Sequence, residues 1–336
     1  MLRGCLLMAL LAAGCDAASS SPPTQPLPDA ATPPSPDAAT PDALAMPDGA
    51  PPQPETTHRV PIAFAGSLQN PCWSPASDRL AFTRFAGGYN GGQSGIAVVA
   101  RAGGSASVVI DDGAQNVGLP GCWNGTSNKI VYSSDVVDTD EVWIINPDGT
   151  GAHRVTHRSG AQAFEPSLSP DGQQVVFESH PQGVSTQGTI WKIRVDGSGL
   201  TQLTRSADDR EPNWAPAGDR ILFQSLRSGN WDIWTMATDG SDLVDVTHSV
   251  AEDTDASWSP DGRFIVYSSN EGGLNLAALF VIPAAGGAPV RVTQTNRYEG
   301  APAWSPDGRA IAFESSTGDP DGSAGTEIWI APAPPL

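Results

Sequence analysis

The sequence predicts an all-β fold: a six-bladed β-propeller with four strands in each blade. Three observations carry this prediction. A unit of about 46 residues recurs six times, each copy contains four strand signals, and an additional strand signal near the start of the repeat region allows the last blade to close on the first. The composition agrees with this fold class, because 36 Gly and 31 Pro among 336 residues disfavour a mainly helical protein.

The repeated unit is centred on a large residue, Trp in five of the six copies, directly before a tight turn. We call these residues the anchors: they are Trp73, Trp123, Leu168, Trp214, Trp258 and Trp304. Successive anchors are 50, 45, 46, 44 and 46 residues apart. This spacing is typical of propeller blades, each of which is one small sheet.

Each copy contains four strand signals that are rich in β-branched and aromatic residues. The first strand ends at the anchor, and the second contains an aromatic residue such as Phe177 or Tyr267. The third carries another Trp in most copies, and the fourth resembles HRVT at 153–156. Tight turns such as SPDG at 169–172 join the first strand to the second. We expect the large side chains to pack between neighbouring sheets.

The ends of the repeat region predict how the ring closes. The sixth copy lacks a fourth strand, whereas residues 58–60 precede the first anchor and repeat the sequence of residues 153–155. Residues 58–64 are therefore predicted to complete the last blade as its outer strand. This pairing removes an open sheet edge, which would otherwise invite aggregation.

The first 15 residues have the features of a lipoprotein signal peptide. Arg3 precedes an apolar run at 6–13 that is too short to span a bilayer as a helix. The sequence LAAGC at 11–15 resembles a bacterial lipobox, although Ala12 stands where that motif usually has Leu. The resemblance implies lipidation at Cys15 and an exported protein anchored to the bacterial envelope, on its periplasmic side or at the cell surface. An ordinary signal peptide that contains a cysteine by chance is the alternative.

Residues 16–57 have the composition of a disordered tether. They contain 12 Pro and six acidic residues, and no basic or aromatic residue. Such a segment buries too little apolar surface to fold, and its prolines favour an extended, semi-rigid spacer. The predicted organisation is therefore a signal peptide at 1–15, a tether at 16–57 and a propeller at 58–336.

The turn sequences also carry a family resemblance. The run WSPDG, at 258–262 and 304–308 and with variants in the other copies, resembles the repeats of TolB-like propellers. The resemblance covers residues 58–336 and implies a propeller that binds another envelope lipoprotein or a secreted protein. The chain does not resemble TolB itself, because the tether stands where TolB has a separate α/β domain.

Loop lengths indicate which face of the propeller carries function. The connections from first to second strand and from third to fourth are short and uniform, whereas the others are long and variable, as at 83–95. Binding residues usually lie on irregular loops, so we place the binding surface on the long-loop face. Acidic residues recur there, three and five positions before the anchors. With one arginine they form the candidate partner-binding set: Glu165, Asp209, Arg210, Glu211, Asp253, Asp255 and Glu299.

Three interpretations of these acidic residues remain open. They form a ring that binds a basic patch on a protein partner, they hold Ca²⁺ at Glu165, Glu211 and Asp255, or they cap loop amides and stay solvated. We expect no other metal and no cofactor. Arg205, Arg210 and Arg297 stand among the acidic residues and are expected to neutralise part of the ring.

Composition and motifs exclude several functions. With 37 acidic and 18 basic residues and a net charge of −19, the chain is not expected to bind nucleic acid, or a membrane except through its lipid. No nucleophile elbow, zinc-protease motif, phosphate loop or dinucleotide fingerprint is present.

We therefore expect a monomeric, non-catalytic interaction module. The alternative is a propeller enzyme or carbohydrate-binding protein with its ligand or metal in the central funnel. Three aromatic residues of the long-loop face would stack on sugars in that case: Tyr89, Trp231 and Tyr298.

Cys72 and Cys122 stand directly before two successive anchors, where the other copies have small residues. Either they form a disulfide, as an oxidising compartment permits, or they are buried free thiols. We favour free thiols, because adjacent inner strands are expected to lie slightly too far apart for a disulfide.

Overall fold

The computed structural model describes residues 56–111, 113, 117–118, 123–205, 207–318 and 325–335. The predicted signal peptide, Cys15 and residues 16–55 of the predicted tether lie outside the described residues. Within those ranges the regular secondary structure consists of β-strands, as predicted, and no helix there is long and apolar enough to cross a membrane.

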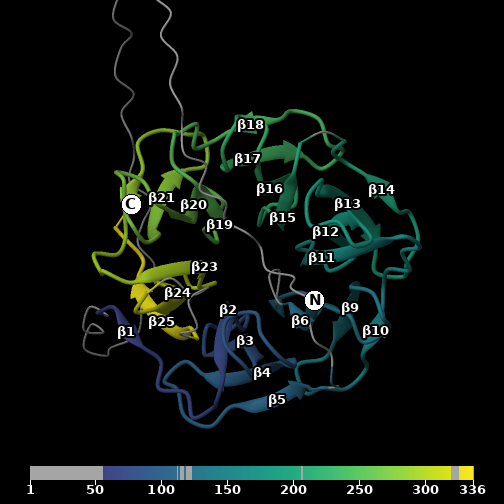
Figure 1. The fold of residues 1–336 in the computed structure, drawn as a ribbon, viewed down its shortest axis with the longest axis horizontal. Coiled ribbons are helices and arrows are strands. Elements are labelled where there is room, and N and C mark those ends of the chain that lie inside the picture. The colour runs from purple at the N-terminus through teal and green to yellow at the C-terminus, as the bar shows by residue number, and fades with distance from the viewer. Residues whose placement is uncertain are drawn as a thin grey trace, which may run out of the picture. The chain divides into compact units, whose positions relative to one another are not determined.

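Six antiparallel sheets follow one another in a ring and correspond to the six predicted blades (Figure 1). Blade 1 contains β2 (Ser67–Trp73), β3 (Arg79–Phe85), β4 (Ser94–Ala100) and β5 (Ser107–Ile110). Blade 2 contains β6 (Val117–Gly118), β7 (Trp123–Asn124), β8 (Lys129–Ser134), β9 (Glu141–Ile145) and β10 (His153–Arg154). Blade 3 contains β11 (Ala161–Leu168), β12 (Gln174–Pro181), β13 (Thr189–Arg194) and β14 (Thr201–Gln202).

The second half of the ring has the same construction. Blade 4 contains β15 (Asp209–Trp214), β16 (Arg220–Ser225), β17 (Asp232–Ala237) and β18 (Val244–Asp245). Blade 5 contains β19 (Asp253–Trp258), β20 (Phe264–Ser269), β21 (Ala278–Pro283) and β22 (Val290–Arg291). Blade 6 contains β23 (Tyr298–Trp304), β24 (Ala310–Ser316), β25 (Glu327–Pro332) and β1 (His58–Arg59).

The first strand of each blade lies nearest the centre of the ring, and the short fourth strand lies at the rim (Figure 1). Because neighbouring strands are antiparallel, the turns after the first and third strands share one face, which we call the tight-turn face. The longer connections after the second strands lie on the opposite, long-loop face. The chain thus reaches the central channel from the long-loop face at the start of each inner strand.

The core lies between blades rather than at a single centre. The second-strand aromatic residues are the largest fully buried side chains: Phe82, Tyr132, Phe177, Phe223, Tyr267 and Phe313. The anchor Trp258 of blade 5 packs in one cluster with Leu222 and Ile233 of blade 4. Large apolar side chains therefore hold each blade to its neighbour, as expected from the sequence.

The N-terminal strand β1 forms the outer edge of blade 6, where His58 pairs with Ile330 and Arg59 with Trp329. The Val60 N–H also donates to the Ile328 carbonyl at 2.9 Å. The pairing is shorter than the predicted 58–64, because Ile62 turns away and bridges Gly104 of blade 1.

Cys72 on β2 is disulfide-bonded, so the expectation of a free thiol is wrong for this residue. Cys122 lies outside the described residues. The Cys72 side chain is buried and packs in a core cluster with Trp123 and Tyr132 of blade 2.

Candidate functional site

The candidate site lies in the central channel, where five inner strands carry a β-bulge. In each of β2, β11, β15, β19 and β23, three residue steps of the inner strand span two steps of its partner. The residues at the bend have φ values between 45° and 54°: Asn70, Glu165, Glu211, Asp255 and Ala301. We call them the bulge residues. Few residues other than Gly adopt this left-handed conformation, and the bulge enforces it in five blades.

Three of the five bulge residues carry carboxylates, and these are the predicted site residues three positions before the anchors. Because Asn70 and Ala301 adopt the same backbone conformation, the bend itself belongs to the blade architecture. Blades 3, 4 and 5 differ from blades 1 and 6 in carrying an acidic side chain at this position: Glu165, Glu211 and Asp255, all of which are partly exposed.

A second-strand side chain accepts a hydrogen bond from the bulge residue of the next blade. Glu178 Oε2 accepts from the Glu211 N–H at 2.8 Å, and Gln224 Oε1 accepts from the Asp255 N–H at 3.0 Å. Glu314 Oε2 accepts from the Asn70 N–H at 3.1 Å. Each bond satisfies a backbone donor that the bulge removes from the strand ladder and also links two blades. These three acceptors were not among the predicted site residues, although each directly follows the buried aromatic residue of the second strand.

The carboxylates of several blades converge around the channel. Burial raises the pKa of Glu165 well above its ordinary value, and the negative charges of Glu178 and Asp255 raise it further. Burial likewise raises the pKa of Glu211, with contributions from Asp255 and Glu165. Side chains from blades 3, 4 and 5 influence one another in this way because the inner strands approach one another near the ring axis.

Glu314 lies in the same group and is almost fully buried. Burial raises its pKa to about 8, and the charge of Asp255 contributes to the shift. The carboxyl group of Glu314 therefore retains its proton at neutral pH more often than an exposed glutamate does.

Two of the three predicted aromatic residues join this group. Tyr89, from the loop between β3 and β4, donates its hydroxyl to Glu314 Oε1 at 3.0 Å, and the Tyr298 hydroxyl lies 3.5 Å from the same oxygen. The two rings meet edge to face, with their centroids 6.4 Å apart. Burial, followed by the charge of Glu314, raises the pKa of both tyrosines. Trp231 does not join them, and its ring packs 5.2 Å from the guanidinium of Arg210.

The acidic residues five positions before the anchors have a different role from the predicted one. Asp209, Asp253 and Glu299 are fully buried, so the expectation that they contact a partner is wrong. Their carboxylates bind local hydroxyl and guanidinium groups: Ser225 and Arg227 at Asp209, Ser249 and Ser269 at Asp253, and Thr293 and Thr295 at Glu299. These hydrogen bonds stabilise the connections at the long-loop face. This role resembles the third interpretation given above, in which the acidic residues cap loops.

The arginines among the acidic residues have contacts close to their own positions. Arg210 forms two hydrogen bonds with Asp208, from Nε at 3.0 Å and from Nη2 at 2.6 Å. Arg297 donates to Ser315 and packs over the Trp329 ring, and Arg205 donates to Gln202.

The residues considered as calcium ligands do not fit a metal site. Among the residues that the structure describes, no group of three or more His, Cys, Asp or Glu side chains is placed to hold a metal ion. Glu165, Glu211 and Asp255 stand on the inner strands of three different blades.

Comparisons with known proteins agree with this architecture. Among curated proteins, Atu1656 of Agrobacterium fabrum is 30% identical over 164 residues, which cover 44% of this chain and 55% of that protein. A Protein TolB homolog of Chlorobium luteolum is 32% identical over 142 residues, 42% of this chain and 31% of that protein. The chain thus spans about half or less of the length of these relatives.

Solved structures show the same fold at low sequence identity. TolB from Acinetobacter baumannii has a TM-score of 0.59 at 17% identity, with 81% of this chain and 65% of that chain covered. An oligogalacturonate lyase from Vibrio parahaemolyticus has a TM-score of 0.52 at 12% identity, with 83% and 91% covered. The family model of the TolB beta propeller domain matches residues 54–229 and 212–325. The chain therefore belongs to the TolB beta propeller domain family.

Proposed function

We propose that this chain is a non-catalytic interaction module, exported and anchored through Cys15 to the bacterial envelope. Its propeller binds a cationic segment of an envelope or secreted protein at the channel. The observation that carries the proposal is the convergence of Glu165, Glu211 and Asp255 from successive blades: they are partly exposed, and their charges raise one another's pKa values at Glu165 and Glu211.

The electrostatics of the channel favour a cationic ligand. Burial first, and then the charges of neighbouring carboxylates, raise the pKa values of Glu165 and Glu211, so their ionised forms are unfavourable together in the free chain. A Lys or Arg side chain placed among them would relieve this repulsion and lower those pKa values. Partner binding is therefore expected to release protons and to strengthen as the pH rises above the ordinary pKa range of glutamate.

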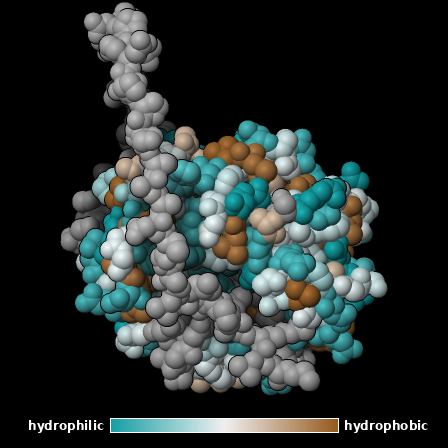
Figure 2. Space-filling view, turned by 45° about the horizontal axis from the view of Figure 1, so that its top comes forward, coloured by the Kyte–Doolittle hydropathy of each residue, from teal (hydrophilic) through white to brown (hydrophobic). Residues whose placement is uncertain are grey.

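The exposed surface is consistent with recognition through polar groups. On the face shown in Figure 2, hydrophobic residues lie in small groups separated by hydrophilic ones. A partner bound through the channel carboxylates would gain orientation and speed of association from electrostatic complementarity.

The test is photo-crosslinking in cells of the full chain with a probe at Tyr89. Capture of one envelope or secreted protein is expected, and charge reversal of Glu165, Glu211 and Asp255 to Lys should abolish it. The matched control is charge reversal of three exposed aspartates in turns of the tight-turn face: Asp148, Asp196 and Asp239. Equal capture by the channel variant and the control variant would refute the proposal.

A carbohydrate-binding or enzymatic role is the second candidate, and the hydrogen-bonded group of Tyr89, Tyr298 and Glu314 favours it. Aromatic rings beside a carboxyl group are suited to stacking on a sugar and bonding its hydroxyls. A saturable change in tyrosine fluorescence with acidic or neutral oligosaccharides, lost in Tyr298→Phe and Tyr89→Phe, would favour this role. The absence of such a change, together with crosslinked capture, would favour the interaction module.

A further inference from the structure

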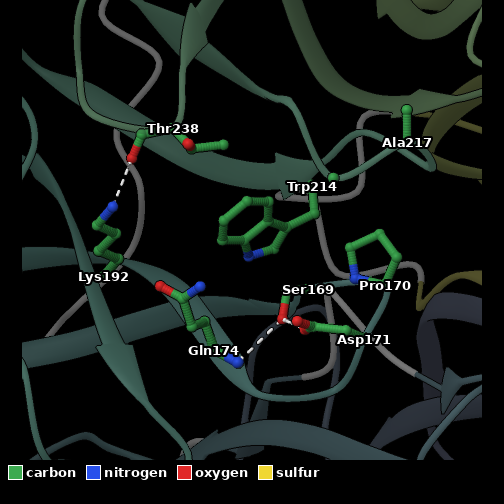
Figure 3. A pocket seen from close by; sticks show the side chains of 9 residues that line it. Ser169, Pro170, Asp171, Gln174, Lys192, Trp214, Ala217 and Thr238 are labelled. Carbon is green, nitrogen blue, oxygen red and sulfur yellow. Dashed lines mark hydrogen bonds between the residues drawn. The ribbon is translucent and has the colours of Figure 1, made fainter.

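A cavity of about 250 Å³ opens at the seam between blades 3 and 4 on the tight-turn face. Its wall includes Asp171, Gln174 and Lys192 of blade 3, and Trp214 and Thr238 of blade 4 (Figure 3). This place is distinct from the channel carboxylates, so a ligand bound here would be independent of the proposed partner.

A contact that covers the anchor ring at another seam has no counterpart beside Trp214. At the seam between blades 1 and 2, Arg79 stands six residues after its anchor and places its guanidinium 4.8 Å from the ring of Trp123. Gln174 stands six residues after the anchor of blade 3. Its side chain is shorter and uncharged, so the space beside the Trp214 ring is left open.

The indole of Trp214 leaves a hydrogen-bond donor without a partner. Its Nε1 is buried and has no acceptor, and the residue as a whole is 6% exposed. The other Trp anchors all donate: Trp73 to the Ala303 carbonyl, Trp123 to Asn128, Trp258 to the Asn213 carbonyl and Trp304 to the Gly308 carbonyl. Three tryptophans of the third strands, Trp143, Trp234 and Trp329, also have a buried Nε1 without a partner, but only Trp214 lines the cavity. Buried donors are rarely left unpaired, since each such group destabilises the fold, so the position of this donor beside the cavity points to an acceptor that is added on binding.

Lys192 adds a positive charge to the same wall. Its ammonium donates to the Thr238 carbonyl at 2.7 Å, which fixes the position of Nζ at the cavity edge (Figure 3). An ammonium has three N–H donors, so two remain for other acceptors. Figure 3 shows the indole nitrogen on the ring edge that faces the Gln174 amide, whereas the Lys192 ammonium lies further off, beside Thr238.

We propose that this cavity binds a carboxylate group. One carboxylate oxygen accepts from Trp214 Nε1 and the other from Lys192 Nζ, after the Gln174 side chain turns aside to uncover the indole nitrogen. A carboxylate has two acceptor oxygens, one for each of these two donors. The Asp171 carboxylate in the same wall disfavours the greater negative charge of a phosphate. The carboxylate belongs to a small organic acid or to the end of a polypeptide.

The test uses the full chain with ¹⁵N-labelled indole groups, whose N–H signals are followed by NMR at constant ionic strength. Loss of one signal in Trp214→Phe assigns it. Probes are succinate, a short peptide with a free carboxyl terminus, its amidated form, succinamide and inorganic phosphate. We expect a saturable downfield shift of the Trp214 signal with succinate or the free-terminus peptide, and none with the amidated peptide, succinamide or phosphate.

Variants make the test specific. Lys192→Met should weaken binding at least tenfold, while Lys129→Met, the matched change at the other lysine of the chain, should leave it unchanged. Gln174→Arg should abolish binding by filling the cavity. A response to the peptide alone identifies a polypeptide terminus as the source, and a response to succinate identifies a small acid. No saturable shift with either carboxylate probe, an equal shift with succinamide, or equal effects of the two lysine substitutions would overturn the proposal.

Discussion

Replacing Glu314 with Gln isolates the contribution of one buried carboxyl group to stability. Glu314 accepts hydrogen bonds from the Asn70 N–H and from the Tyr89 hydroxyl. A Gln side chain has nearly the same shape and can accept the bond from the Asn70 N–H. The chain itself shows that this exchange is compatible with the fold, because Gln224 accepts the equivalent bond from Asp255 in another pair of adjacent blades.

The pH dependence follows from the pKa of Glu314, which burial raises from 4.5 to about 8. Between these two values the folded protein retains a proton that the unfolded chain has lost. The stabilisation that the protonated carboxyl group contributes to the fold is therefore fully present below pH 4.5 and is lost as the pH rises through 8. At about 1.4 kcal/mol for each pH unit, the loss reaches up to about 5 kcal/mol. Gln cannot ionise, so the variant lacks this loss.

Urea unfolding at pH 5, 7 and 9 measures the effect. Wild type and Glu314→Gln should have similar unfolding free energies at pH 5, and the variant should be several kcal/mol more stable at pH 9. Asp219→Asn, at an exposed position, controls for the general effect of removing a charge and should follow wild type. Parallel pH profiles for wild type and Glu314→Gln would refute the assignment of a raised pKa to this group.

Three further predictions concern packing and backbone geometry. Trp258→Ala should lower the unfolding free energy by about 3–5 kcal/mol, because the anchor packs between two blades, and a loss below about 1 kcal/mol would contradict that. Gln174→Arg should raise it by ~0.5–1 kcal/mol by placing a guanidinium over Trp214; no gain in thermal stability would count against this explanation of the cavity. Gly240→Ala should destabilise more than Gly272→Ala. Both glycines have positive φ, at a penalty of about 1–2 kcal/mol for Ala, but only at Gly240 would the added Cβ lie 2.6 Å from a backbone oxygen. Equal losses in urea unfolding would show that this close contact relaxes freely.

The sequence predicted the blades well because their signals repeat. The anchors, the buried second-strand aromatic residues and the tight turns recur at a fixed spacing, so one copy confirms another. The pairing of β1 with the last blade was also predictable, because residues 58–60 repeat the sequence of residues 153–155. The length of that pairing was not predictable, since the switch of Ile62 to blade 1 depends on a contact between segments far apart in the chain.

The site was predicted less well, and the bulge explains why. Residues two positions apart in a regular strand point to the same side, so Asp209 and Glu211 were expected to act together. The bulge between them separates their environments, and Asp209 is buried against Arg227 while Glu211 is partly exposed at the channel. Bulges depend on strand pairing rather than on a local sequence signal. The cavity beside Trp214 was likewise not predictable from the sequence. It depends on how far the Gln174 side chain reaches toward the Trp214 ring of the next blade.

The pairing of β1 with β25 also joins the two ends of the propeller. Arg59 and Glu327, which form an ion pair across this edge, are separated by 268 residues. Closing so long a loop costs chain entropy, which the contacts of blade 6 with its neighbours have to offset. Blades 1 to 5 each form from strands that follow one another in the chain, whereas blade 6 needs both ends of the propeller. A chain cut anywhere between residues 59 and 327 therefore separates two strands of the same blade, so the ring edge of blade 6 depends on the whole propeller being present.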